Sequence, residues 1–202
     1  MSTPATIEIV SSLADVPSAI WNNGVDPNDP FTDHAFLTLL EDAGCVGTDA
    51  GWVPMHLLVR QGDEVVGRAP LYLKNNSYGE YIFDWGWADA SHRAGIPYYP
   101  KLVSAVPFTP ATGRRLLTDK PEIRQLMSEA MLEVMRSTNA KSLHLLFASE
   151  EERTTLAEHP ALIGRSTHQF HWDNDGYEDF DDMADATRNA VYDWAGGLSR
   201  RA

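Results

Sequence analysis

The sequence predicts an α/β protein of the α+β kind, with a mixed, largely antiparallel sheet flanked by helices. Two observations support this prediction. The first half of the 202-residue chain alternates short strand patterns with glycine and proline turns, which indicates hairpins. The second half alternates apolar runs with helical patterns, which is typical of strands joined through crossover helices. The length suits one domain of ordinary size.

Hairpin patterns organise the first half. A β-branched run predicts the first strand, and a Gln-Gly-Asp turn predicts that the two strands flanking it pair. Either Thr32 or Asp33 is placed to cap a helix that Gly44 stops. The expected elements are a strand at 6–10, helices at 15–22 and 33–43, strands at 52–60 and 64–74, a strand at 78–85 and a proline-broken strand at 98–106.

Crossover patterns organise the second half. Asp119 and Glu122 form a capping-box pattern around Pro121, and apolar residues then recur at helical spacing to Val134. The run 142–147 is nearly all apolar, so we expect a strand buried on both faces, with His144 as a buried, hydrogen-bonded histidine. Another capping box predicts a helix from residue 149, and a strand is expected at 161–172.

Charge and composition exclude several classes of protein. The 16 Lys and Arg against 29 Asp and Glu give a net charge of −13, which argues against a DNA- or RNA-binding protein. A single cysteine, Cys45, excludes an internal disulfide and a cysteine-based zinc site. We expect no bound metal, no membrane span and a cytoplasmic protein, because no apolar run approaches about 20 residues and no targeting signal is present.

Nine of the twenty aromatic residues lie between Tyr72 and Phe108. In a strand at 78–85, alternation places aromatic side chains on one face, and Glu80 and Asp84 on the other. This pattern fits either an aromatic core face or a ligand groove with the two carboxylates on its floor. Four strand residues span roughly 13 Å, so the carboxylates are expected to act separately, one of them as a base toward an amine.

Basic and polar residues near this segment are the other candidates for ligand binding. Lys74, Lys101 and the Arg114–Arg115 pair after Gly113 either bind an anion or are solvated surface charges. In a strand at 167–174, Gln169 and His171 would share a face that either binds a ligand or is merely polar. Its two histidines fall on opposite faces, so a metal pair is not expected there.

Seven short segments in register resemble FemAB-like bacterial proteins, which are GNAT-related and linked to peptidoglycan biosynthesis. They read Pro-Phe at 30–31, Gly-Trp-Val-Pro-Met-His at 51–56, Pro-Leu-Tyr-Leu-Lys at 70–74, Ser-Tyr-Gly-Glu-Tyr-Ile-Phe-Asp-Trp at 77–85, Tyr-Tyr-Pro-Lys at 98–101, Pro-Phe-Thr-Pro at 107–110 and Gln-Phe-His-Trp at 169–172. The resemblance implies a GNAT-like fold over residues 1–177. It also implies transfer of an acyl or aminoacyl group to a small-molecule or peptide amine. The donor would be acyl-CoA or aminoacyl-tRNA as a co-substrate, without a tightly bound cofactor.

The chain departs from this family in two ways. Family members run to nearly twice this length, with a basic helix and a second domain after a Gly-Tyr-x-x-Phe stretch, whereas residues 178–202 here form an acidic, helical tail. The pyrophosphate loop of ordinary GNAT acetyltransferases is also absent. We therefore expect a homodimer or pairing with a missing second half, and an inactive chain if that half carries the donor site.

Two hypotheses follow. In the first, the chain is a transferase unit in which Glu80 or Asp84 accepts the amine proton. In the second, it is a non-catalytic recognition or pairing module with an aromatic-lined groove. The residues expected to hold the substrate are Lys74, Tyr78, Tyr99, Lys101, Arg115, Gln169, His171 and Trp172.

Overall fold

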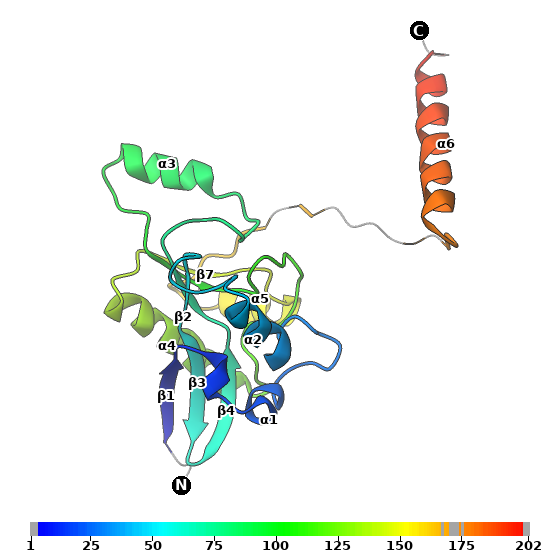
Figure 1. Ribbon diagram of the computed structural model, residues 1–202. Coiled ribbons are helices and arrows are strands. Elements are labelled where there is room, and N and C mark those ends of the chain that lie inside the picture. Colours follow the sequence, from blue (N-terminus) through cyan, green and yellow to red (C-terminus); the bar gives the residue numbers. More distant parts are fainter. Residues whose placement is uncertain (1–3, 167, 170–173, 175, 200–202) are drawn as a thin grey trace. The chain divides into compact units, whose positions relative to one another are not determined.

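The computed structural model describes residues 4–166, 168–169, 174 and 176–199, with side chains described up to residue 189 (Figure 1). The chain divides into two units, Met1–Gly164 and Arg165–Ala202. The second unit contains the helix α6 (Phe180–Ser199). The first contains β1 (Ala5–Val10), the 3-10 helix η1 (Leu13–Asp15), α1 (Ser18–Asn22), α2 (His34–Asp42), β2 (Trp52–Pro54), β3 (His56–Gln61), β4 (Glu64–Ala69), β5 (Tyr72–Lys74), α3 (Trp85–Arg93), β6 (Lys101–Ser104), α4 (Pro121–Ser137), β7 (Leu143–Leu145) and α5 (Glu150–Ala157).

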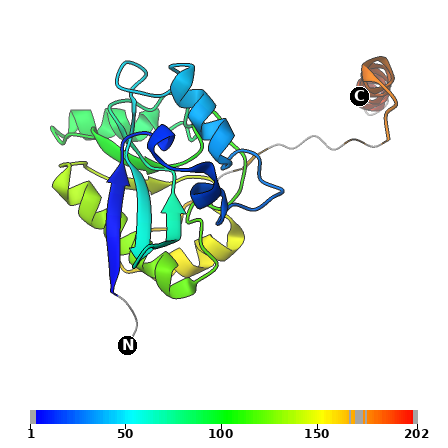
Figure 2. The same cartoon turned by 60° about the horizontal axis from the view of Figure 1, so that its bottom comes forward.

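Two sheets share one long hairpin. The order β1-β3-β4 is antiparallel throughout, and these strands run side by side in Figure 2 with β1 at the outer edge. The order β2-β5-β6-β7 is antiparallel except for the parallel pair β6–β7. Only Met55 separates β2 from β3, and its N–H donates to the carbonyl oxygen of Leu71 at 2.8 Å. The predicted hairpin is therefore confirmed, but it passes from one sheet into the other at Met55 and Pro70, which has no N–H to donate.

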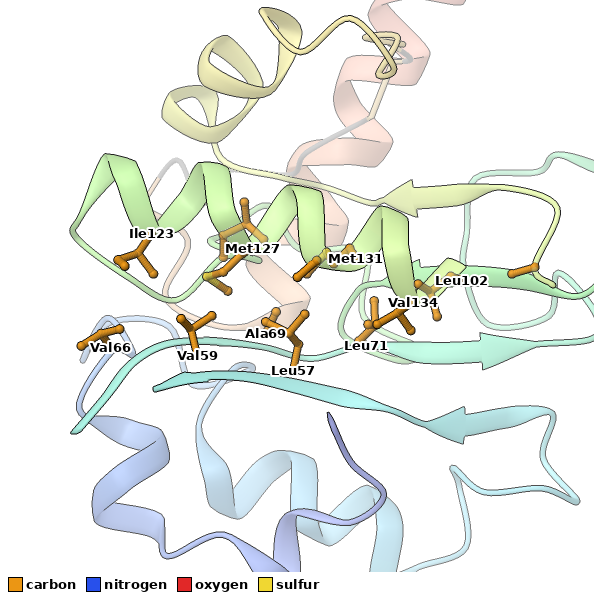
Figure 3. Close-up of a cluster of buried hydrophobic side chains, with 13 residues drawn as sticks. Leu57, Val59, Val66, Ala69, Leu71, Leu102, Ile123, Met127, Met131 and Val134 are labelled. Carbon is orange, nitrogen blue, oxygen red and sulfur yellow. The ribbon is translucent and has the colours of Figure 1, made fainter. Parts of the chain in front are cut away.

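The main hydrophobic core lies between α4 and these strands (Figure 3). Ile123, Met127 and Met131 come from one face of the helix, as the predicted helical spacing requires, and pack over Leu57 and Val59 of β3. Gly67 of β4 lets the helix approach closely. A Cβ there would lie 2.8 Å from both Ile123 Cγ2 and Met127 Sδ.

Alternation along β3 builds a second core on the opposite face. Leu58 points away from the α4 core and packs with Leu13, Trp21 and Leu37, which come from η1, α1 and α2. A third cluster forms around Trp52, Tyr72 and Val103 of β2, β5 and β6. The first unit is thus a mixed sheet structure with helices on both sides, which confirms the predicted GNAT-like α/β class.

Four local predictions are wrong. Residues 78–85 form a loop that leads into α3, and not a strand. The run 142–147 contributes only the three half-buried residues of β7, so His144 is half-buried and lies 2.8 Å from the Ser142 hydroxyl. Residues 161–166 and 168–169 form no strand and are mostly exposed, while 167 and 170–172 lie outside the described residues.

The fourth correction concerns the start of α4. Lys120 occupies the N-cap position without a side-chain cap, and Asp119 pairs with Arg114 at 2.7 Å instead of capping the helix. Pro121 fills the first helical turn, where a missing N–H costs nothing. The other predicted capping box, between Ser149 and Glu152, is confirmed at the start of α5.

Candidate functional site: a buried ion cluster

The site begins with a row of three side chains across the second sheet. Trp52, Lys74 and Lys101 are direct cross-strand partners on β2, β5 and β6, so their side chains share one face. Two lysines placed opposite each other repel, and both side chains are fully buried. Such a pair requires counter-charges nearby.

Residues 75–100, between β5 and β6, supply these charges. The Nζ of Lys101 donates to Glu80 Oε2 at 2.8 Å, to Asp84 Oδ2 at 2.6 Å and to Ser77 Oγ at 2.8 Å. Glu80 also reaches Lys74, with 3.7 Å between Oε1 and Nζ. We call Lys74, Glu80, Asp84 and Lys101 the ion cluster.

The expected 13 Å separation of Glu80 and Asp84 is therefore wrong, since both carboxylates contact the same ammonium group. The physical reason is that the chain turns back on itself instead of extending. Tyr81 and Phe83 have φ of 58° and 51°, in the left-handed region that extended strands do not use.

Tyrosines and a tryptophan complete the surroundings of the ion cluster. The Tyr98 hydroxyl donates to Asp84 Oδ2 at 2.7 Å, and the Tyr99 hydroxyl lies 2.7 Å from Ser77 Oγ. Lys74 Nζ donates to the carbonyl oxygen of Tyr78 at 3.0 Å and lies 3.4 Å from the centroid of the Trp52 ring, a cation–π geometry.

Burial and hydrogen bonding move the pKa values of this cluster in different directions. Burial raises the pKa of Glu80 and lowers that of Lys74 to about 8. Burial alone would raise the pKa of Asp84 as well, but hydrogen bonds from Lys101 and Tyr98 outweigh it, and the pKa falls below its ordinary value. The two carboxylates are thus chemically distinct although they share one partner.

Of the two expectations for the aromatic residues of 78–85, a core face or a ligand groove, the core face is wrong. Tyr81, Phe83 and Trp85 are exposed, Phe83 by 78%, and Tyr78 packs edge-on against Trp85 on the outside. A hollow of about 580 Å³ lies elsewhere, beside Asp26, Asp29, Asp33 and Phe36 in the chain leading into α2. These aspartates accept hydrogen bonds from neighbouring residues of the same loop and helix start.

The remaining predicted binding residues lie outside the ion cluster. Arg115 is buried, and its guanidinium donates to the carbonyl oxygens of Leu146, Arg114 and Ala111. Gln169 is exposed and belongs to the second unit. His171 and Trp172 lie outside the described residues.

Comparison with known protein families decides the identity of the chain. The model of the FemAB-like family, described as peptidoglycan biosynthesis/recognition, matches residues 12–190. The chain belongs to the FemAB-like family. Neither the curated proteins nor the solved structures contain a significant match.

Two further findings on this FemAB-like chain concern metal binding and membrane spans. In the described part, no group of three or more His, Cys, Asp or Glu residues is arranged to hold a metal ion. Among those same residues, no helix is long and apolar enough to cross a membrane.

Sequence reasoning missed three members of the FemAB-like site, namely Trp52, Ser77 and Tyr98. Each lies within one of the segments that carry the family resemblance, which was the one available signal. The pairing of Lys74 with Lys101 joins residues far apart in the sequence, so no local pattern predicts it.

Proposed function

We propose that this FemAB-like protein is a unit for transferring an acyl or aminoacyl group to an amine of a peptidoglycan precursor. Glu80 would be the proton acceptor and Asp84 the electrostatic anchor of the site. The supporting observation is that the environment pushes their pKa values apart, raised for Glu80 and lowered for Asp84. Paired carboxylates with divergent pKa values commonly divide acid–base work in this way.

The reaction would balance as follows. The acceptor arrives as an ammonium ion and gives a proton to Glu80, whose Oε1 is buried and accepts no hydrogen bond from the described residues. The freed amine attacks the donor carbonyl carbon and a C–N bond forms. The bond from that carbon to the thioester sulfur or the ester oxygen of the donor breaks, and the leaving group takes the second proton, which the attacking nitrogen loses as the amide forms. Glu80 then returns its proton to solvent.

Charge balance explains the role proposed for the lysines and tyrosines. Lys101 holds both carboxylates near one point, and Lys74 offsets the charge of Glu80. Tyr99 would support the substrate through Ser77, and Tyr78 would contact it from the exposed side. The arginines of the loop before α4 are occupied by carbonyl oxygens and by Asp119, so they do not support a phosphate site there.

The donor would therefore bind with help from outside this unit. We propose acyl-CoA or aminoacyl-tRNA as a co-substrate, with the donor site completed by a second copy or by a second family domain. Both donors are cytoplasmic molecules, and the proposal places the protein in that compartment.

The test compares Glu80→Gln with Asp84→Asn, using Glu64→Gln, at the exposed first residue of β4, as the control. Transfer from labelled aminoacyl-tRNA or acetyl-CoA to a precursor peptide amine would be measured by mass spectrometry. We expect Glu80→Gln to lower kcat about 10² to 10⁴-fold. The control should retain full transfer. A folded Glu80→Gln variant with wild-type kcat would overturn the role of Glu80.

One observation favours a second candidate, a recognition module without catalysis. The ion cluster is fully buried, while the aromatic side chains nearby are exposed. A module of this kind would bind peptidoglycan fragments equally well with Glu80→Gln and would transfer nothing from either donor. Binding measured by calorimetry beside the transfer assay separates the two functions.

A further inference from the structure

Residues 75–100 reverse the usual pattern of burial, since their buried side chains are polar and most of their large apolar side chains are exposed. The buried residues among them are Ser77, Glu80 and Asp84, all of which are polar. Most of their large apolar and aromatic side chains are exposed. The exceptions are Ile82, which is partly buried against the Trp52 core, and the half-buried Tyr98 and Tyr99. The exposed set is Tyr78, Tyr81, Phe83, Trp85, Trp87 and Ile96.

Apolar packing therefore does little to hold this segment down. The helix α3 within it has no buried residue, and Figure 1 shows it projecting from the first unit, away from β1, β3 and β4. In an ordinary element, burial of an apolar face provides most of the stabilisation. Here Ile82 and a close contact between Gly79 and the Phe108 ring are the apolar anchors.

Polar contacts hold the segment closed at both of its ends. Near its start, Ser77 and Glu80 bind the Nζ of Lys101. Near its end, the Tyr98 hydroxyl binds Asp84, and Asp84 binds the same Nζ. A single ammonium group, on a residue of the sheet, thus ties together both arms of the segment.

The closed arrangement also leaves buried polar atoms without hydrogen bonds. Trp52 Nε1, Glu80 Oε1 and Asp84 Oδ1 have no such partner among the described residues. All three belong to the ion cluster or to its row on the sheet. Buried unsatisfied groups are unfavourable, and they raise the energy of the closed state relative to one in which water or a ligand reaches them.

We propose that residues 75–100, which carry Glu80 and Asp84, form a lid over Lys74 and Lys101 of the sheet. The contacts to Lys101 latch this lid, and it lifts to admit a ligand. The identity of the ligand as the acceptor amine rests on the proposed function. The existence of the lid does not depend on that function, because it is argued from burial and hydrogen bonding alone. In the open state Lys74 and Lys101 become accessible to solvent together.

The four lysines of the chain provide the test. Lys74 and Lys101 are buried beneath the lid, whereas Lys120 and Lys141 are exposed and serve as internal controls. The full chain would be treated with N-hydroxysuccinimide acetate, and acetylation at each lysine would be followed by peptide mass spectrometry. We expect slow acetylation of Lys74 and Lys101 at a rate independent of low urea concentrations, which is the signature of local opening.

Variants that weaken the latch sharpen this test. Ser77→Ala with Tyr98→Phe removes two hydroxyls and leaves all four charges, and we expect acetylation of Lys74 and Lys101 to accelerate about tenfold or more. Rates at Lys120 and Lys141 should not change. Tyr81→Phe is the matched control, an exposed tyrosine of the same segment outside the latch. If the double variant does not fold, Tyr99→Phe alone carries the same comparison.

Either of two results overturns the proposal. The first is that Lys74 and Lys101 react only in step with global unfolding across urea, and the second is that weakening the latch leaves their acetylation rates unchanged. Because acetylation is read without any donor or acceptor, loss of the lid and loss of the transfer function are distinguishable. If the lid opens but Glu80→Gln leaves transfer unchanged, the proposed transferase role of Glu80 is refuted and the lid proposal stands.

Discussion

At the residue scale, the decisive feature is a pair of buried lysines on neighbouring strands. Lys74 and Lys101 face each other across β5 and β6, a position where like charges are unfavourable. Glu80 and Asp84 make the ion cluster neutral, so each charge depends on the others. Removing one member should therefore cost far more than removing a surface charge.

Lys101→Met should lower the free energy of unfolding by about 3–5 kcal/mol, because it leaves two buried carboxylates with Lys74 as their remaining ammonium partner. Urea denaturation at neutral pH measures this loss. Lys141→Met, an exposed control, should change stability by less than about 0.5 kcal/mol. Equal effects of the two substitutions would contradict the structural role of the ion cluster.

Lys74 gives a pH dependence with a defined sign. Its pKa falls from 10.5 to about 8 on folding, so between these values the unfolded chain binds the proton more readily than the native protein does. The free energy of unfolding should therefore rise with pH across this window. The measurement is the difference in the free energy of unfolding between the wild type and Lys74→Met at each pH. Tyrosines also titrate in this range, and their contributions cancel in the difference. A difference that stays flat or falls above pH 8 would refute the lowered pKa.

At the element scale, a buried glutamate joins α5 to the loop before α4. Glu152 is fully buried, and its Oε1 accepts the N–H groups of Arg115 and Leu116 at 2.8 and 2.6 Å. Its Oε2 accepts the N–H of Ser149 and closes the capping box. The same side chain thus caps its own helix and accepts backbone hydrogen bonds from a loop that is distant in the sequence.

Glu152→Ala should destabilise the protein by about 2–4 kcal/mol, because three backbone N–H groups lose their acceptor. Glu150→Ala, two residues earlier and exposed, removes an ion pair with Arg153 and should cost far less, because solvent screens this pair. Thermal unfolding of both variants provides the comparison. Similar losses would show that Glu152 acts through α5 alone.

The elements differ in how far local sequence determines them. The helices α2 and α5 were predictable because Asp33 and Ser149 cap them, and the 61–63 turn marked the hairpin. The segment 78–85 was not, since its alternation of aromatic and polar residues fits a strand. Tyr81 and Phe83 adopt left-handed backbone angles that residue type does not predict. The ion cluster depends on long-range register, which no local pattern contains.

At the scale of the whole molecule, the first unit contains the hydrophobic cores that the structure describes. All three clusters draw their residues from between Ala5 and Leu156. The second unit carries α6 and begins at Arg165. Folding of the first unit should therefore depend on residues 1–164 alone.

A chain ending at residue 164 should unfold cooperatively, with a urea midpoint close to that of the full chain. Its near-ultraviolet circular dichroism should keep the signals of Trp21 and Trp52, which are fully buried in the first unit. A truncated chain that lacks this spectrum, or that unfolds gradually, would show that the second unit is needed for the first to fold.

The shared hairpin has a consequence for the order of folding. Strands β3 and β4 are joined by the two-residue turn of Gly62 and Asp63, and the φ of 63° at Gly62 suits glycine. They are therefore the closest in sequence of the paired strands that the structure describes. Local pairing is fast, whereas β1 and β7 must close long loops before they can join. Since the hairpin belongs to both sheets, one early event would align two sheets at once. The refolding rate, more than the unfolding rate, should then respond to substitution of Gly62.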